Sequence, residues 1–200
     1  EVTAISILIN YLSGTDLWIT ALIVLLSTLT YTLYGGLRAS IFTDNIQMIV
    51  IGLLLIILIS IISSSSGDNF SFSFIKEKNP QLLSSFYIPN YTAGLTFFIA
   101  VAATNLFHQG NWQRVYAAKN YKTLKLALIF SFLIIVPIVF LMGFIGMVSF
   151  SIDPSIRADL GFFNLLLKNQ TELISFIIII LGLALTISTV DTLVNAISSL

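Results

Sequence analysis

The chain has 200 residues, of which 57% are hydrophobic and only 9% are charged, whereas about a quarter of the residues in a soluble domain are charged. This composition predicts an integral membrane protein. Nine Lys and Arg residues balance nine Asp and Glu residues, so no basic character suggests nucleic-acid binding. The absence of cysteine excludes a disulfide framework, a thiolate metal site and a thiol nucleophile.

Charge-free stretches divide the chain into candidate membrane spans, because a helix needs about 20 apolar residues to cross the hydrocarbon core. The sequence predicts helices over approximately 1–13 (a partial span), 17–36, 43–63, 91–110, 123–149 and 172–200. The longer connections 64–90 and 150–171 are predicted outer loops. Since the chain opens on Glu1 and runs directly into apolar sequence, unlike a signal peptide, we expect residues 1–200 to be an internal fragment of one transmembrane domain.

Basic residues indicate the orientation, because Lys and Arg in short loops favour the cytoplasmic side. Arg38 and the basic residues between Arg114 and Lys125 predict that these two connections lie inside. The outer loop 64–90 is rich in Ser but carries Phe70, Phe72 and Phe74 at alternate positions. Two readings of it stay open: a flexible linker, or a segment packed onto the membrane domain. In the second outer loop, Pro154 followed by an apolar stretch from Phe162 predicts a short amphipathic helix.

Ionisable residues inside spans are costly and usually mark a cavity or a pathway. Asp44 begins one predicted helix, and Asp191 interrupts the last one. In a helix, Ser188, Asp191, Thr192 and Asn195 fall on one face by their spacing of three and four residues. Such carboxylate and hydroxyl oxygens suit a hard cation such as sodium, and a proton site is the other possibility. The structural alternatives are hydroxyls bonded to their own helix and an Asp44 favoured by a helix N-terminus.

A second polar stretch runs from Thr104 to Arg114, and it is too polar to face lipid, so it must be buried in protein or line water. His108 within it is either a proton carrier or a hydrogen-bonded structural residue. Gly35 and Gly36 indicate a turn at the end of a helix.

Three separated motifs resemble the sodium:solute symporter family, the relatives of sodium-coupled sugar, proline, sialic acid and urea carriers. The first is Tyr31-Thr32-Leu33-Tyr34-Gly35-Gly36-Leu37-Arg38-Ala39 with Thr43-Asp44-Asn45-Ile46-Gln47 after it. The second is Gln113-Arg114-Val115-Tyr116-Ala117-Ala118-Lys119. The third is Ser188-Thr189-Val190-Asp191-Thr192-Leu193-Val194-Asn195.

The resemblance implies an all-α integral membrane fold, namely a fragment of the five-plus-five inverted-repeat (LeuT-like) transporter from the end of core helix three to core helix eight. It implies a main sodium site at Leu185, Ser188 and Thr189, and a second cation site at Asp44, Asp191 and Thr192. It also implies that Val101, Thr104 and Asn105 line the solute cavity, to which we add His108. The glycines Gly35 and Gly36 and the pair Gln113 and Arg114 belong to cytoplasmic loop motifs.

The predicted function is that of a multi-pass symporter of the plasma (inner) membrane, which couples sodium to uptake of a small polar solute by alternating access. Sodium is the implied coupling ion, with no organic cofactor. The solute is urea-like, an amino acid or another small polar molecule, and the motif Asn111 to Arg114 is most similar to urea or polyamine carriers. A proton-coupled transporter of the same fold and a transporter-like sensor module are the alternatives.

An enzyme is not expected. Two intramembrane aspartates could form a protease that shares one proton. However, Asp191 is preceded by Ser-Thr-Val rather than by a Gly-x-Gly run.

Overall fold

The computed structural model describes residues 2–155, 160–167 and 171–198, and the regular elements among them are helical. In chain order they are α1 (Val2–Ser13), α2 (Leu17–Ser66), the 3-10 helix η1 (Gly67–Asn69), α3 (Phe72–Lys78), the 3-10 helix η2 (Pro80–Leu83), α4 (Ile88–Phe107), α5 (Gln109–Ala117), α6 (Tyr121–Ile152), α7 (Gly161–Leu167) and α8 (Glu172–Ser198). The parts of the predicted outer loop 150–171 at 156–159 and 168–170 lie outside the described residues.

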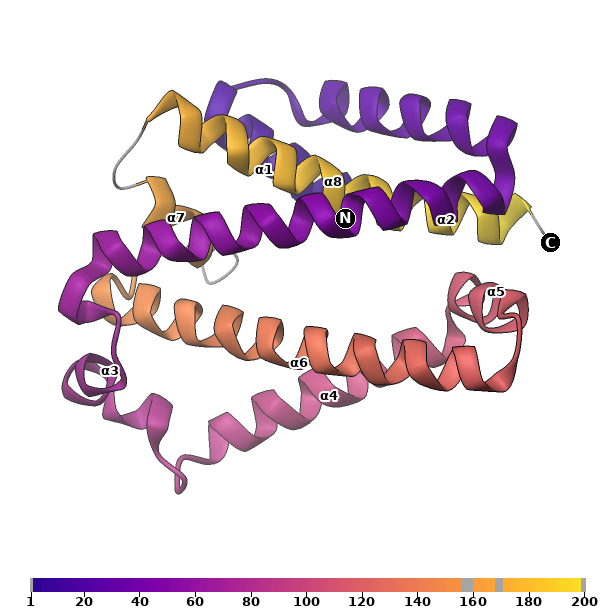
Figure 1. Ribbon diagram of the computed structural model, residues 1–200. Coiled ribbons are helices and arrows are strands. Elements are labelled where there is room, and N and C mark those ends of the chain that lie inside the picture. The colour runs from indigo at the N-terminus through magenta and orange to yellow at the C-terminus, as the bar shows by residue number, and fades with distance from the viewer. Residues whose placement is uncertain (1, 156–159, 168–170, 199–200) are drawn as a thin grey trace. The chain divides into compact units, whose positions relative to one another are not determined.

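Helix α2 has 50 residues and is broken once, at Gly36. A straight helix of this length would measure about 75 Å, more than twice the hydrocarbon core of about 30 Å. Gly36 has φ 57° and ψ −157°, a backbone conformation that is essentially restricted to glycine. The ribbon turns back on itself there, so that the two halves of α2 run in opposite directions (Figure 1). Residues 37–42, which were expected to connect two spans, are therefore helical. The chain reverses direction at Gly36, just before them.

Among the described residues, α2, α6 and α8 are long and apolar enough to cross a membrane. The range 91–110, predicted as a further span, is occupied by α4 and the start of α5, and α4 is not one of these three helices. Its sequence contains Asn90, Thr92, Thr96, Thr104 and Asn105, which lower its apolar content. The chain therefore combines strongly apolar helices with a more polar one.

The first compact unit of the chain comprises residues 1–61 and 169–200. Within it, α1 packs against α8. The contact is close because α8 has no side chain at Gly182: a Cβ there would lie 2.8 Å from Cδ1 of Ile5 and 3.0 Å from Cδ2 of Leu8. Ile5 and Leu8 are both buried. A small residue thus allows the two helices to approach each other closely, as is common between membrane helices.

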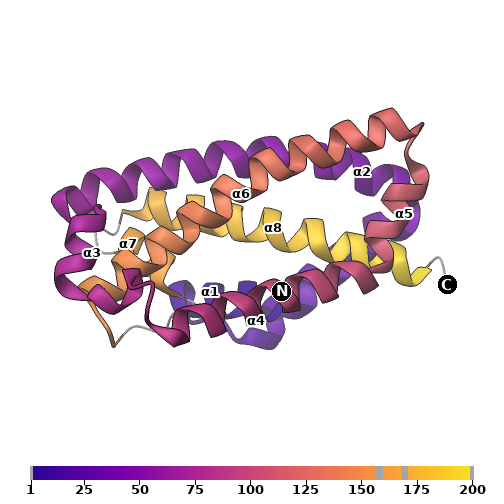
Figure 2. The same cartoon turned by 90° about the horizontal axis from the view of Figure 1, so that it is seen from below.

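The second compact unit comprises residues 62–168. Helices α3 and α7 lie against the same end of α6 in both views (Figures 1 and 2). Phe70 and Phe72 contact the ring of Phe144 on α6 at centroid distances of 4.9 and 4.7 Å, and Ile75 of α3 is fully buried. Of the two readings of the Ser-rich segment, the structure therefore supports the packed one.

Helix α7 occupies the place where an amphipathic helix is predicted. Leu165, Leu166 and Leu167 are buried, and Gly161 lies close to Ser149 of α6. The basic connection 114–125 is not only a loop, because α5 extends to Ala117 and α6 begins at Tyr121. Asn120 caps α6 by accepting a hydrogen bond from the backbone N–H of Thr123 at 2.8 Å, which fixes the start of that helix.

Candidate cation site

Two polar stripes face each other within the first unit, one on the second half of α2 and one on α8. Each stripe has the spacing i, i+3, i+4, i+7, which places its residues on one face of a helix. The α2 stripe consists of Ser40, Thr43, Asp44 and Gln47, and the α8 stripe of Ser188, Asp191, Thr192 and Asn195. Three side-chain hydrogen bonds join the two stripes. We call this contact the polar seam.

Asp191 is the centre of the seam and is 0% exposed. Its Oδ1 accepts hydrogen bonds from Ser40 Oγ at 3.0 Å and from Thr192 Oγ1 at 3.3 Å. Its Oδ2 accepts from Tyr31 Oη at 2.9 Å and from Thr43 Oγ1 at 3.2 Å. A buried carboxylate is costly unless it is hydrogen-bonded. Tyr31 and Ser40 supply that stabilisation, whereas Thr43 and Thr192 share their single protons with backbone carbonyls of their own helices.

The bend at Gly36 brings these donors together. Tyr31 precedes Gly36 on the first half of α2, whereas Ser40 and Thr43 follow it on the second half. Both halves therefore bond to the same residue of α8. Gly35 contributes to the tightness of the bend, since a Cβ at this position would overlap that of Ala39.

The second carboxylate of the seam, Asp44, accepts a hydrogen bond from Ser188 Oγ at 2.7 Å. Thr189 follows Ser188 directly, and its Oγ1 donates to the backbone carbonyl of Leu185, one turn earlier on α8, at 3.2 Å. Thr192 Oγ1 donates to the carbonyl of Ser188 at 2.8 Å. The residues predicted for the two sodium sites therefore occupy consecutive turns of one helix, with Asp44 joined to them from α2.

Chemically, the acceptor atoms of the seam side chains are all oxygens: carboxylates, hydroxyls and the side-chain amide oxygens of Gln47 and Asn195. Hard cations with a low charge prefer such oxygen ligands. The hydroxyl groups that donate to carboxylates here also have lone pairs that can face a cation. The arrangement is thus suited to bind a monovalent cation between α2 and α8.

Sequence reasoning identified Asp44, Ser188, Asp191 and Thr192, but it missed Tyr31, Ser40 and Thr43 as partners of Asp191. A signal for two of them exists in the sequence, because Ser40, Thr43, Asp44 and Gln47 repeat the spacing of the α8 stripe. The contact of Tyr31 carries no such signal, since it depends on the bend at Gly36.

The predicted solute-cavity residues lie in the second unit, on α4 and at its end. Val101 is 44% exposed, and Thr104 and Asn105 are exposed as well. Thr104 Oγ1 donates to the carbonyl of Ala100 at 2.7 Å, and Asn105 Nδ2 to that of Val101 at 2.8 Å. The Thr104 hydroxyl and the Asn105 side-chain nitrogen therefore donate within their own helix.

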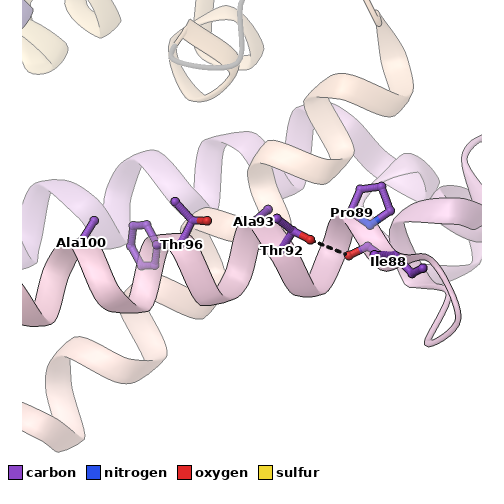
Figure 3. A pocket seen from close by; sticks show the side chains of 7 residues that line it. Ile88, Pro89, Thr92, Ala93, Thr96 and Ala100 are labelled. Carbon is purple, nitrogen blue, oxygen red and sulfur yellow. Dashed lines mark hydrogen bonds between the residues drawn. The ribbon is translucent and has the colours of Figure 1, made fainter.

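A shallow groove on α4 is lined by Ile88, Pro89, Thr92, Ala93, Thr96, Phe97 and Ala100. All of these residues belong to the one helix, and Thr92 donates a hydrogen bond to the carbonyl of Ile88 (Figure 3). The groove is an open face of α4 rather than an enclosed cavity.

His108 separates α4 from α5, with an extended backbone between the two helices. Its Nδ1 is buried and has no hydrogen-bond partner among the described residues. Asn111 Nδ2 donates to Asn105 Oδ1 at 2.9 Å across this break. The motif residues Gln113 and Arg114 lie on α5, where Arg114 Nη1 donates to the carbonyl of Gly110.

The comparisons with known proteins agree with this helical, membrane-spanning architecture. The spermidine transporter DUR31 of Candida albicans is 28% identical over 203 residues, an alignment that covers all of this chain and 38% of that protein. The chain thus spans little more than a third of the length of this curated relative. No solved structure matches the chain. The model of the sodium:solute symporter family matches residues 1–200, so the chain belongs to the sodium:solute symporter family.

Proposed function

We propose that this chain is part of a secondary active transporter that couples sodium entry to uptake of a small polar solute across the plasma membrane. The observation that carries the proposal is the polar seam, where Asp44 and Asp191 meet hydroxyl groups between α2 and α8. Family membership supports the same function. Ionisable residues inside membrane spans are retained mainly where ions or solutes pass.

The main sodium site of the proposal uses the backbone carbonyl of Leu185 and the hydroxyls of Ser188 and Thr189. Leu185 and Thr189 lie one helical turn apart, and the Thr189 hydroxyl already contacts the Leu185 carbonyl. Leu185 is 46% exposed, so this side of α8 is open to a further helix that would supply the remaining ligands. A second cation position lies in the polar seam, among Asp44, Asp191 and Thr192.

In the five-plus-five inverted-repeat fold that we propose for the complete protein, sodium binding favours the outward-open state in which the solute site is complete. Val101, Thr104, Asn105 and His108 are proposed to line that solute site. The name of the Candida relative points to a polyamine, so spermidine is the first solute to test, followed by urea and amino acids.

The test is uptake by the full-length protein in proteoliposomes, with and without an inward sodium gradient, with spermidine, urea, proline and a sugar as solutes. We expect one solute to be accumulated only with the gradient. Ser188→Ala and Thr189→Ala should each raise the sodium concentration needed for half-maximal uptake by about tenfold, the effect of about 1.4 kcal/mol of lost binding free energy. Uptake of every accumulated solute at an unchanged rate without sodium would contradict the proposal.

A proton-coupled transporter of the same fold is the second candidate, because Asp191 is a fully buried carboxyl group. Intramembrane carboxyl groups serve as proton relays in many transporters. In the same proteoliposomes, uptake that follows a pH gradient and is lost in Asp191→Asn would favour this candidate over sodium coupling.

A further inference from the structure

We infer that the side-chain oxygen of Gln47 is a ligand of the second sodium ion, which it binds together with Asp44 and Ser188, and that Asp191 positions the helices without touching this ion. The inference rests on the proposed sodium symport and revises the ligands of its second site: Asp44 remains a ligand, and Ser188 and Gln47 take the place of Asp191 and Thr192.

The register of the polar seam places Gln47 next to these partners. Ser40 and Thr43 bond to Asp191, and Asp44, farther along α2, bonds to Ser188, which comes earlier on α8. The two stripes therefore run antiparallel. Gln47 lies one turn beyond Asp44 on the same face of α2, so it reaches α8 on the Leu185 side of Ser188.

Gln47 has an unsatisfied acceptor. Its Oε1 is buried and has no hydrogen-bond partner among the described residues. Buried carbonyl oxygens without a donor are rare in folded proteins and unfavourable. A cation beside Asp44 would satisfy this oxygen. Its ligands would then be the Asp44 carboxylate, the Ser188 hydroxyl and the neutral amide oxygen of Gln47. One negative charge among oxygen ligands matches a monovalent hard cation.

Asp191 has the opposite character, because hydroxyl groups surround both of its oxygens. Two hydroxyl groups lie within hydrogen-bond distance of each carboxylate oxygen: Ser40 and Thr192 near Oδ1, and Tyr31 and Thr43 near Oδ2. Tyr31 and Ser40 use Asp191 as their side-chain acceptor on opposite sides of the Gly36 bend. Asp191 therefore holds the bend of α2 on α8, and this contact keeps Asp44 opposite Ser188.

The test measures equilibrium binding of radioactive sodium to the purified full-length protein in detergent. Thr189→Ala serves as the background, because it weakens the proposed main site and leaves the second one. In this background Gln47→Leu should raise the half-saturating sodium concentration by about tenfold or more. Asn45→Leu is the matched control: it makes a similar change on the same helix at an exposed position, and its affinity should stay within about twofold of the background.

Gln47→Glu keeps the ligand oxygen and should bind sodium at least as tightly as the background, which separates loss of a ligand from loss of folding. Asp191→Asn should lower the melting temperature while sodium affinity changes by less than about threefold. Equal affinities of Gln47→Leu and Asn45→Leu would overturn the assignment of Gln47. An affinity loss in Asp191→Asn as large as that in Gln47→Leu would overturn the positioning role.

Failure of the inference and failure of sodium symport give different results. If the unmodified protein binds sodium but the Thr189→Ala background binds none, the second site is overturned and symport through the main site stands. If the unmodified protein binds no sodium at all, the proposed function is overturned together with the inference.

Discussion

The α2 and α8 pair and the helix α4 use polar residues in contrasting ways. On α8, Asp191, Thr192 and Asn195 are buried, and the side chain of Asp191 reaches three residues of α2. On α4, Thr104 and Asn105 are exposed and bond to the carbonyls of their own helix. None of the residues of α4 is buried. The polar groups of the first pair connect helices far apart in the sequence, whereas the printed bonds of Asn90 and Asn105 on α4 reach only segments next to it in the chain.

The contrast teaches which part of the proposed transport machinery is complete within this chain. The seam is formed by residues of the first unit alone, so its proposed role in cation binding can be tested by substitutions within that unit. A solute site on α4 needs side chains from other helices to close it, since its groove is lined by α4 alone. Four substitutions in the full-length protein test this contrast: two remove polar groups, and two change glycines that bend α2 or let α8 approach α1 closely.

The largest effect is expected from Asp191→Ala. It removes the acceptor of the partly buried Tyr31 and of the buried Ser40. Loss of this acceptor should cost about 3 kcal/mol in unfolding free energy. Thermal unfolding in detergent measures the loss. Asp68→Ala, at an exposed acidic residue, is the control and should leave the melting temperature unchanged. An equal melting temperature for both variants would show that the seam does not hold the helices together.

The second-largest loss of stability is expected from Gly36→Ala, because alanine is strained at φ 57° and ψ −157°. We expect a destabilisation of about 1 to 3 kcal/mol. Gly52→Ala is the matched control on the same helix, where a Cβ meets nothing within 4 Å and should stabilise by up to about 1 kcal/mol. The two melting temperatures should shift in opposite directions. Equal shifts would mean that the bend does not require glycine.

Gly182→Ala should cost about 1 to 2 kcal/mol, since the new methyl group presses on Ile5 and Leu8 of α1. Ile5→Val removes the nearest methyl group and should recover part of the loss in the double variant, which a double-mutant cycle measures. Gly146→Ala, with open space around its Cβ, serves as the control on α6. Strictly additive effects of the two changes would contradict the close approach of α1 to α8.

The smallest effect on stability is expected from Thr104→Ala on α4, within about 0.5 kcal/mol, because the hydroxyl is exposed and bonds only to its own helix. Its effect should instead be on transport, as a higher KM for the solute with an unchanged sodium requirement. A large drop in melting temperature with an unchanged KM would place Thr104 in the packing of the domain rather than in the solute site.

Periodicity and composition predict much of this molecule. The apolar stretches of α2, α6 and α8, the turn at Gly35 and Gly36 and the polar stripe of α8 are all visible in the sequence. These features are local, since they depend on spacing along one helix or on the conformational freedom of glycine.

The pairing of the stripes could not be predicted in the same way. The contacts of Asp191 with Tyr31, Ser40 and Thr43 depend on the angle of the bend at Gly36 and on the register of α2 against α8, neither of which leaves a local pattern. The packing of Phe70 and Phe72 on Phe144 is similar, because a Ser-rich segment with alternating Phe residues is equally consistent with a flexible linker. The sequence alone therefore leaves open how helices far apart in the chain are aligned against one another.

The central claim is that α2 and α8 bind sodium between them, and sodium-dependent stabilisation of the full-length protein tests it most directly. Melting temperatures are compared in sodium chloride and choline chloride of equal ionic strength, with the unmodified protein and Asp44→Asn. A ligand at one hundred times its Kd stabilises by about 2.7 kcal/mol, so the unmodified protein should melt higher in sodium, and most of this difference should disappear in Asp44→Asn. The same melting temperature in both salts for the unmodified protein would contradict the claim.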